Sequence, residues 1–219
     1  MTDRQQDRIV VATRSSYKLR ELRELLGVSN LELVSLDDLR VAGEPIEDGE
    51  TFETNARIKA RFAARATGLP ALADDSGIEV EALGGLPGVR TRRYAGPHAT
   101  DPENNEKLLA ELRGLPAARR GARYVCVLAL AVPDATAPGG LRLLSRRGTC
   151  RGRIASEPRG TGGFGYDPIF EPAPEPPGGR TFGQYGAAEK HAISHRARAA
   201  RRIAPVVQAE IGDHGPNLP

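Results

Sequence analysis

The feature that most constrains this chain is a pair of adjacent carboxylates next to a short apolar run. Residues 69–73 (LPALA) predict a buried strand, and Asp74 and Asp75 follow it directly. Two neighbouring anions at the mouth of a core strand repel each other and are costly to desolvate. A divalent cation such as Mg²⁺, arriving with a phosphate-rich substrate, would offset that cost. The plainer alternative is that Asp-Asp-Ser-Gly forms only a polar turn.

The composition is that of an ordinary globular chain, with 39% hydrophobic and 27% charged residues. Its 219 residues suffice for one large domain or one domain with two lobes. No apolar run reaches the length of a membrane span, and the polar start lacks the pattern of a signal peptide, so we expect a cytoplasmic protein without a membrane partner. Cys126 and Cys150 do not make a disulfide framework or a metal site.

The charge balance bears on the class of partner. A net charge of +3 permits anionic substrates but does not argue for nucleic acid. The chain has no tryptophan and few other aromatic residues, so stacking platforms for DNA or RNA are not evident. We therefore expect a small anionic substrate and no nucleic-acid partner.

The N-terminal segment predicts a strand, a short polar loop and a helix. Residues 8–12 (RIVVA) form the strand, and leucines recur at helical spacing over 17–26. Loop amides and a helix N-terminus make an anion site in this geometry. Hydroxyls from Thr13, Ser15 and Ser16, and the charge of Lys18, could bind phosphate there. The alternative is that the serines merely cap the helix.

The rest of the chain alternates strands and helices, which predicts an α/β fold with a mixed sheet. The run 123–132 is the strongest strand and is expected at the centre of that sheet. Further strands are expected at 31–36, 78–83, 141–145 and 149–154, and further helices at 51–67, 101–112 and 187–207. In the acidic loop 44–50, Glu47 and Asp48 offer carboxylates to a metal, although such loops are more often only solvated.

Two later stretches carry further candidates. Glycines crowd residues 160–165, where a backbone can pass close to a ligand and Phe164 can lie flat on a base; the alternative is a tight structural loop with Phe164 in the core. The last predicted helix carries Lys190, His195 and Arg196. Helical spacing does not put all three on one face, so residues 194–196 could instead lie at a helix start.

Four stretches together resemble one known family. VVATRSSYK, LADDSGIEVEALGGLPGV with RYAG, GTGGFGYDPIF and EKHAISHRARA occur here in the same order as in inosine triphosphate pyrophosphatases of the Ham1/RdgB type, also called XTP/dITP diphosphatases. The resemblance covers roughly residues 8–204. It implies an elongated, two-lobed α/β fold around a long twisted sheet, formed by residues 8–208 with substrate between the lobes and tails at 1–7 and 212–219.

The same resemblance implies the activity and the site. Members are usually homodimers that require Mg²⁺ and cleave non-canonical purine nucleoside triphosphates to the monophosphate and pyrophosphate. Asp75 would be the catalytic proton acceptor and would hold the metal with Glu47 and Asp74. Triphosphate would bind to Thr13, Arg14, Ser15, Ser16, Tyr17 and Lys18, and Ser76 would contact substrate. The base would be enclosed by Phe164, Gly165, Tyr166, Asp167, Lys190, His195 and Arg196.

The phosphate loop departs from the family pattern. Thr13-Arg14-Ser15 stands where the family usually has Thr-Gly-Asn, and Gln184-Tyr185 stands where Glu-Leu is common. At Ser15 a shorter hydroxyl thus replaces the asparagine amide of the family, which both donates and accepts hydrogen bonds. Because of these changes, two alternative interpretations stay open: a related enzyme that acts on another nucleotide, and a non-catalytic nucleotide-binding protein.

Overall fold

The computed structural model describes residues 8–28 and 30–211. The predicted tails at 1–7 and 212–219 lie outside the described residues. Within the described ranges, no helix is both long and apolar enough to cross a membrane.

Within residues 8–28 and 30–211, six strands form one sheet in the order β2-β1-β3-β4-β5-β6. β1 pairs in parallel with both β2 and β3, whereas β6 pairs antiparallel with β5. The expected mixed sheet is therefore confirmed, with the apolar β4 inside it. The strands are β1 (Arg8–Val11), β2 (Glu32–Ser35), β3 (Ala71–Val80), β4 (Gly121–Pro133), β5 (Leu141–Ile154) and β6 (Phe170–Pro172).

Two predicted strand breaks are wrong. β3 runs without interruption through Asp74, Asp75 and Ser76, where we expected a turn between two strands. β5 likewise continues through Gly148, where we expected a gap. Low strand propensity at both places is overridden by tertiary context, because β3 and β5 both lie inside the sheet, on either side of β4. The three-residue β6 was not predicted, since so short a segment shows no periodicity.

Five α-helices accompany the sheet in the described part of the chain. Their N-termini follow the predicted caps: the Thr51 hydroxyl accepts from Thr54 N, and Thr100 forms a capping box with Glu103. The predicted helix 187–207 is broken at Ser194, whose backbone is extended and whose hydroxyl accepts from Ala197 N at 3.2 Å. The alternative that 194–196 start a helix is correct. The helices are α1 (Ser16–Leu26), α2 (Phe52–Thr67), α3 (Asp101–Glu111), α4 (Ala187–Ile193) and α5 (His195–Ile211).

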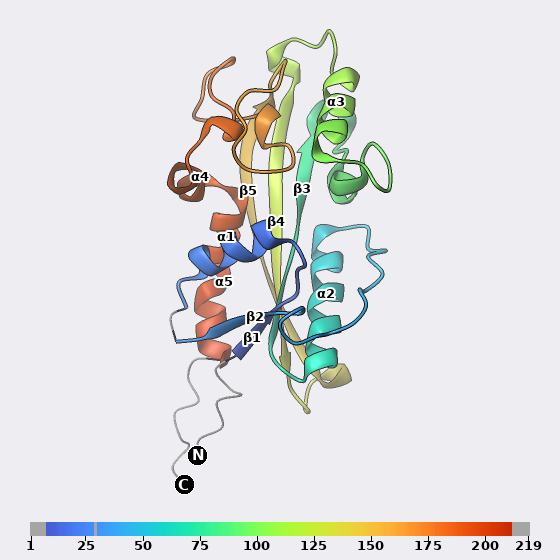
Figure 1. Cartoon of the computed structure of the whole chain (residues 1–219), viewed down its shortest axis with the longest axis vertical. Helices are drawn as coiled ribbons and strands as arrows, with labels where there is room; N and C mark the ends of the chain where they lie inside the picture. Colours follow the sequence, from blue (N-terminus) through green and yellow to red (C-terminus); the bar gives the residue numbers. More distant parts are fainter. Residues whose placement is uncertain (1–7, 29, 212–219) are drawn as a thin grey trace. The chain divides into compact units, whose positions relative to one another are not determined.

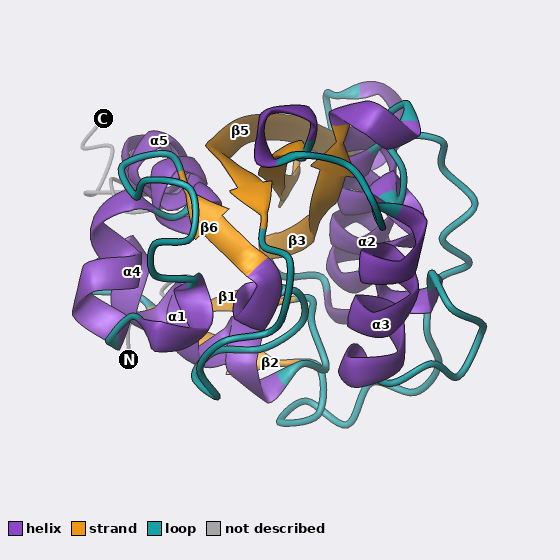
Figure 2. Cartoon of the chain, turned by 90° about the horizontal axis from the view of Figure 1, so that it is seen from above, coloured by secondary structure: helices purple, strands orange, loops and turns teal. Residues whose placement is uncertain are grey.

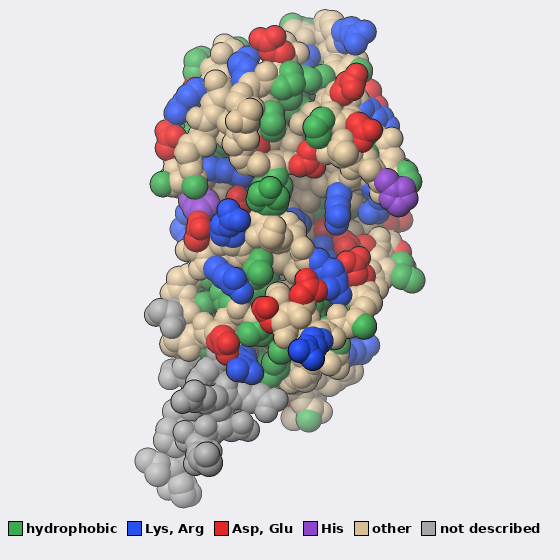
Figure 3. Space-filling view, viewed as in Figure 1, with side chains coloured by type: hydrophobic (Ala, Val, Ile, Leu, Met, Phe, Trp, Pro, Cys, Tyr) green, Lys and Arg blue, Asp and Glu red, His purple; other side chains and the backbone are tan. Residues whose placement is uncertain are grey.

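The described chain divides into two compact units. Unit 1 contains the residues up to Asp75, then Val127–Arg147, then those from Ala199 onward; unit 2 contains Ser76–Cys126 and Gly148–Arg198. Within unit 1, α2 lies on one side of β1 and β3, and α1 lies on the other (Figures 1 and 2). Acidic and basic side chains are interspersed on the face drawn in Figure 3.

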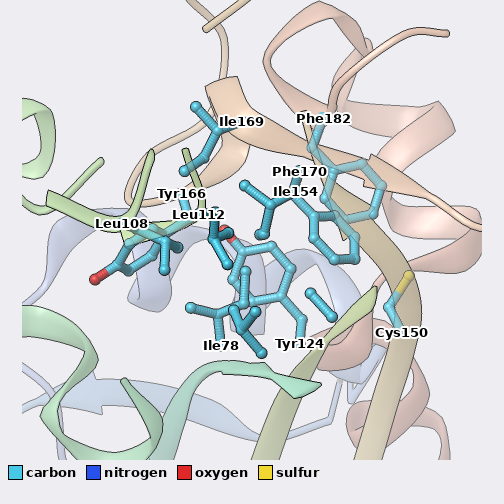
Figure 4. Packing of buried hydrophobic residues seen from close by; sticks show 12 residues of the cluster. Ile78, Leu108, Leu112, Tyr124, Cys150, Ile154, Tyr166, Ile169, Phe170 and Phe182 are labelled. Carbon is cyan, nitrogen blue, oxygen red and sulfur yellow. The ribbon is translucent and has the colours of Figure 1, made fainter. Parts of the chain in front are cut away.

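Each unit has an apolar core. In unit 1 the core includes Val10 and Leu72, both fully buried, from neighbouring strands. In unit 2 the core is rich in aromatic rings: Tyr124 lies 4.7 Å from Phe170 between ring centroids, and Phe170 lies 5.2 Å from Phe182 (Figure 4). Ring pairs at these distances add to the free energy gained by burying their area.

Candidate active site

The loop between β1 and α1 provides the first cluster of predicted residues. The Ser15 hydroxyl caps α1 by accepting from Lys18 N at 3.4 Å, and Thr13 Oγ1 accepts from Ser15 N at 3.1 Å. The capping alternative is thus correct for Ser15. Ser16 and Tyr17 begin the helix on its exposed side, and the side chain of Tyr17 is half exposed.

Asp74 and Asp75 are each paired with a different lysine. Lys18 Nζ, from α1, lies 2.6 Å from Asp74 Oδ1, and Lys59 Nζ, from α2, lies 2.7 Å from Asp75 Oδ1. Successive side chains on a strand point to opposite faces, and α1 and α2 lie on opposite sides of β3 in Figure 1. The two neighbouring anions are therefore held apart and separately neutralised, which explains how β3 tolerates them.

Glu47 contacts the lysine that pairs with Asp75, and not the lysine that pairs with Asp74. Lys59 Nζ lies 3.1 Å from Glu47 Oε2 as well as 2.7 Å from Asp75 Oδ1. Two carboxylate oxygens thus converge on one cationic position, which fits the oxygen ligands that Mg²⁺ takes together with water and phosphate oxygens. Among the described residues no group of three acidic, His or Cys side chains is arranged to hold a metal by itself.

The acid–lysine pair perturbs its own pKa values. Burial raises the pKa of Asp75 above its usual range, although the charge of Lys59 opposes that shift. Burial by itself would lower the pKa of Lys59, but Asp75 and Glu47 outweigh it and the pKa is raised. A carboxylate with a raised pKa at this position is better suited to accept a proton than an ordinary surface aspartate.

Arg14 does not join this cluster through its side chain. Its guanidinium group is bound to the segment between β2 and α2: Nη2 donates to Val41 O and Gly43 O, and Nη1 pairs with Asp37. The expectation that Arg14 binds triphosphate finds no support in these contacts.

Asp167 organises the second cluster, in unit 2. This buried carboxylate lies 2.8 Å from Lys190 Nζ through Oδ2, which also accepts from Phe164 N at 2.9 Å. Its other oxygen accepts from the Tyr124 hydroxyl at 3.3 Å. Asp167 therefore fixes the loop that carries Phe164 as well as the ammonium of Lys190.

Two cations lie against the ring of Phe164. Lys190 Nζ is 4.9 Å from the ring centroid and Arg196 Cζ is 5.6 Å from it, while the ring itself is partly exposed. Arg196 is almost completely buried, and its Nη2 donates to Ser76 Oγ at 2.9 Å. The alternative that places Phe164 in the core is therefore not supported.

The other three predicted base-site residues have structural contacts. Gly165 is held by α3, because its N–H donates to Asp101 and its carbonyl accepts from Asn105. The buried Tyr166 donates its hydroxyl to Thr91 O at 2.8 Å. The His195 ring stacks on Tyr124 with centroids 4.5 Å apart and an interplanar angle of 7°.

Lys59 and Tyr124 were not predicted as site residues. The sequence feature that could have identified Lys59 is its position: it lies four residues after the buried Asn55 and so borders the packed face of α2. Tyr124 lies within the apolar run of β4, where a hydroxyl is unusual but an aromatic ring is not. Neither signal distinguishes a site residue from a core residue.

The family is shown by comparison with known proteins. A model of the Ham1 family matches residues 9–206. The chain belongs to the Ham1 family. This Ham1 chain is 50% identical to a dITP/XTP pyrophosphatase of Syntrophobacter fumaroxidans, over 87% of the chain and 78% of that protein. It is 48% identical to one of Nocardia farcinica, over 92% and 95% respectively.

Solved structures agree with the Ham1 fold. A HAM1 protein from Coxiella burnetii superimposes with a TM-score of 0.81 at 42% identity, covering 92% of this chain and 98% of that one. A nucleoside-triphosphatase / dITP/XTP pyrophosphatase from Mycobacterium abscessus gives 0.72 at 44% identity, with coverage of 90% and 99%. The expected fold class is thereby confirmed for this Ham1 chain.

Proposed function

We propose that this chain is a Mg²⁺-dependent nucleoside triphosphate pyrophosphatase. It would hydrolyse non-canonical purine nucleotides (ITP, dITP and XTP) to the monophosphate and pyrophosphate, and so cleanse the nucleotide pool. One observation carries the proposal: the carboxylates of Glu47 and Asp75 converge on the same ammonium group, that of Lys59, while Lys18 pairs with the adjacent Asp74. The names of its relatives support the same activity.

The phosphate end of the reaction would use unit 1. Lys18 and the start of α1 bind the negative charges of the triphosphate. Glu47 and Asp75 would hold Mg²⁺, which supplies neutralising charge to phosphate oxygens and makes water more acidic. Asp75 accepts the proton of the water that attacks the α-phosphorus, and pyrophosphate leaves toward Lys18. Asp74 keeps the ammonium of Lys18 in place.

The base end would use unit 2. Phe164 offers a flat apolar face on which any purine can stack, so stacking does not separate inosine from adenosine. Arg196 can only donate hydrogen bonds, which suits the 6-keto oxygen of hypoxanthine and xanthine. Adenine presents a donor at that position, and an unpaired buried donor costs about 1–3 kcal/mol.

The experiment is a substrate panel with a matched variant. We expect kcat/KM for ITP and XTP to exceed that for ATP by roughly 5- to 150-fold, the ratio that such an unpaired group produces. Arg196→Ala should narrow the gap, mainly by losing activity on ITP and XTP. Arg198→Ala is the control, because this exposed neighbour donates to Thr149 O instead. Equal wild-type activity on ATP and ITP would contradict the proposal.

Two further outcomes distinguish the alternatives. If GTP or another nucleotide were the best substrate, the chain would be a pyrophosphatase with a different specificity, the alternative that the altered phosphate loop raises. If no pyrophosphate were released with Mg²⁺ present, the chain would be a nucleotide-binding protein. The family resemblance also supports a homodimer in the cytoplasm, and sedimentation of the purified protein tests the oligomeric state.

A further inference from the structure

Arg14 uses its side chain to hold a segment that has no regular structure. Residues 41–50, between β2 and α2, contain neither helix nor strand. Nη2 of Arg14 donates to Val41 O at 3.0 Å and to Gly43 O at 2.9 Å, while Nε lies 3.1 Å from Glu44 Oε1. With the Asp37 pair, the guanidinium group therefore makes three hydrogen bonds and one further ion pair, to Glu44.

The same segment is held at its other end by α2. The side chain of Asn55 accepts from Gly49 N at 2.8 Å and donates to Gly49 O at 3.2 Å. Glu47, whose side chain is 38% exposed, lies between these anchors and contacts Lys59. Irregular backbone keeps a fixed shape only where such contacts repay the conformational entropy that it loses. Arg14 is therefore the anchor that precedes Glu47, and Asn55 is the anchor that follows it.

We propose that Arg14 is a positioning residue for the metal ligand Glu47. By binding residues 41–44 from the phosphate loop, Arg14 sets the distance between Glu47 and the loop that receives the triphosphate. The glycine that is usual at this place in the resembling family has no side chain with which to do so. The inference rests on the proposed function, and it assigns to Arg14 a role other than phosphate binding.

The test compares Arg14→Met with Arg14→Lys and with a control, Arg23→Met. Arg23 is an exposed arginine of α1 that also donates to a backbone carbonyl, Leu33 O, but does not contact residues 41–50. We expect Arg14→Met to raise the Mg²⁺ concentration for half-maximal pyrophosphate release by about 10-fold, as loss of a ligand-orienting contact typically does. At saturating Mg²⁺ the KM for ITP should change by no more than about twofold.

A second measurement needs neither substrate nor metal. In the protein alone, hydrogen exchange of residues 43–50 should become faster in Arg14→Met, while exchange within α2 stays as in the wild type. Arg14→Lys should rescue part of both effects, because an ammonium can keep one or two of the contacts but cannot span all four acceptors. Arg23→Met should show neither effect.

Three results would overturn the inference. A raised KM for ITP with an unchanged Mg²⁺ requirement would make Arg14 a phosphate ligand. Unchanged exchange at residues 43–50 would mean that Arg14 does not anchor the segment. An equal effect in Arg23→Met would mean a general loss of stability. If wild-type protein released no pyrophosphate, the proposed function would fail. Hydrogen exchange, and Mn²⁺ binding measured by electron paramagnetic resonance, would still test whether Arg14 positions Glu47.

Discussion

Asp75 is the residue on which the proposed chemistry depends most directly. Replacing it by Asn removes the proton acceptor and one metal ligand but keeps the size of the side chain. We expect Asp75→Asn to lower kcat by at least about 100-fold, the usual contribution of a general base, while the circular dichroism spectrum stays unchanged. A variant with near wild-type turnover would show that Asp75 is not the base.

Lys18 combines a structural role with the proposed phosphate contact. Its partner Asp74 has a side chain with no exposed surface, so Lys18→Met leaves a buried carboxylate without its charge partner. Breaking such a pair costs roughly 3 kcal/mol of unfolding free energy. We also expect KM to rise for all nucleoside triphosphates alike, so that the ratio of ITP to ATP activity is kept.

The double variant Lys18→Met/Asp74→Asn separates these two effects. Removing the buried charge as well should restore most of the stability, measured by urea unfolding, but should leave KM high. If the double variant recovered a normal KM, Lys18 would have no role in binding phosphate.

Among the connecting elements, the glycine-rich loop contains a close backbone contact that side chains would prevent. Gly160 has φ of +76°, and a Cβ added there would overlap the carbonyl of Gly183. We expect Gly160→Ala to cost roughly 3 kcal/mol or more, because backbone strain and a clash with rigid backbone add together. Gly178→Ala is the control, since its φ is +81° but its Cβ would meet no atom within 4 Å.

Urea unfolding of both variants checks this prediction. The control should lose only the part that comes from the positive φ, so the difference between the two variants measures the close contact. Equal losses would mean that the contact with Gly183 contributes nothing to the stability of the loop.

Most elements could be predicted from sequence because their signals are local. The leucine spacing of α1, the cap at Thr51 and the apolar run of β4 each depend on a few neighbouring residues. The continuity of β3 could not be predicted, because the contacts of Asp74 and Asp75 within it are distant in sequence: Lys18 and Lys59 lie 56 and 16 residues before their partners. The sequence did not decide between one continuous helix over 187–207 and a new helix starting at 194–196, since a serine fits both a helix interior and a helix start.

The candidate site was predictable to a similar degree and for a related reason. Motifs named the acids, Lys18 and Arg196, but a motif does not give the direction of a side chain. The motif therefore predicts that Arg14 binds triphosphate, and it could not predict that the guanidinium group contacts residues 37, 41, 43 and 44. Lys59 belongs to no motif and becomes visible only when α2 is placed beside β3.

On the scale of the whole molecule, we expect both cysteines to report on global unfolding. In the described part of the chain, Cys126 and Cys150 form no disulfide, and each is at most 2% exposed. Burial raises the pKa of the Cys150 thiol to about 11, which Arg198 only partly offsets. The stability gained by keeping this thiol neutral is therefore complete below the unfolded pKa of about 8.5 and is lost as the pH rises toward 11.

We expect the native protein to react slowly with a thiol reagent at pH 8, and both thiols to react at once in denaturant. The measurement is the absorbance of released thionitrobenzoate over time. Rapid reaction of either thiol in native buffer would mean that its surroundings open locally without global unfolding.

β3 passes from unit 1 into unit 2 between Asp75 and Ser76. Since side chains alternate along a strand, inserting or deleting one residue here would turn every following side chain to the opposite face. Asp75 would then face α1 instead of α2, or the β3 residues that follow it would turn to the opposite face of the sheet. The fold therefore constrains the length of this stretch, in addition to the constraint that the proposed chemistry places on Asp75.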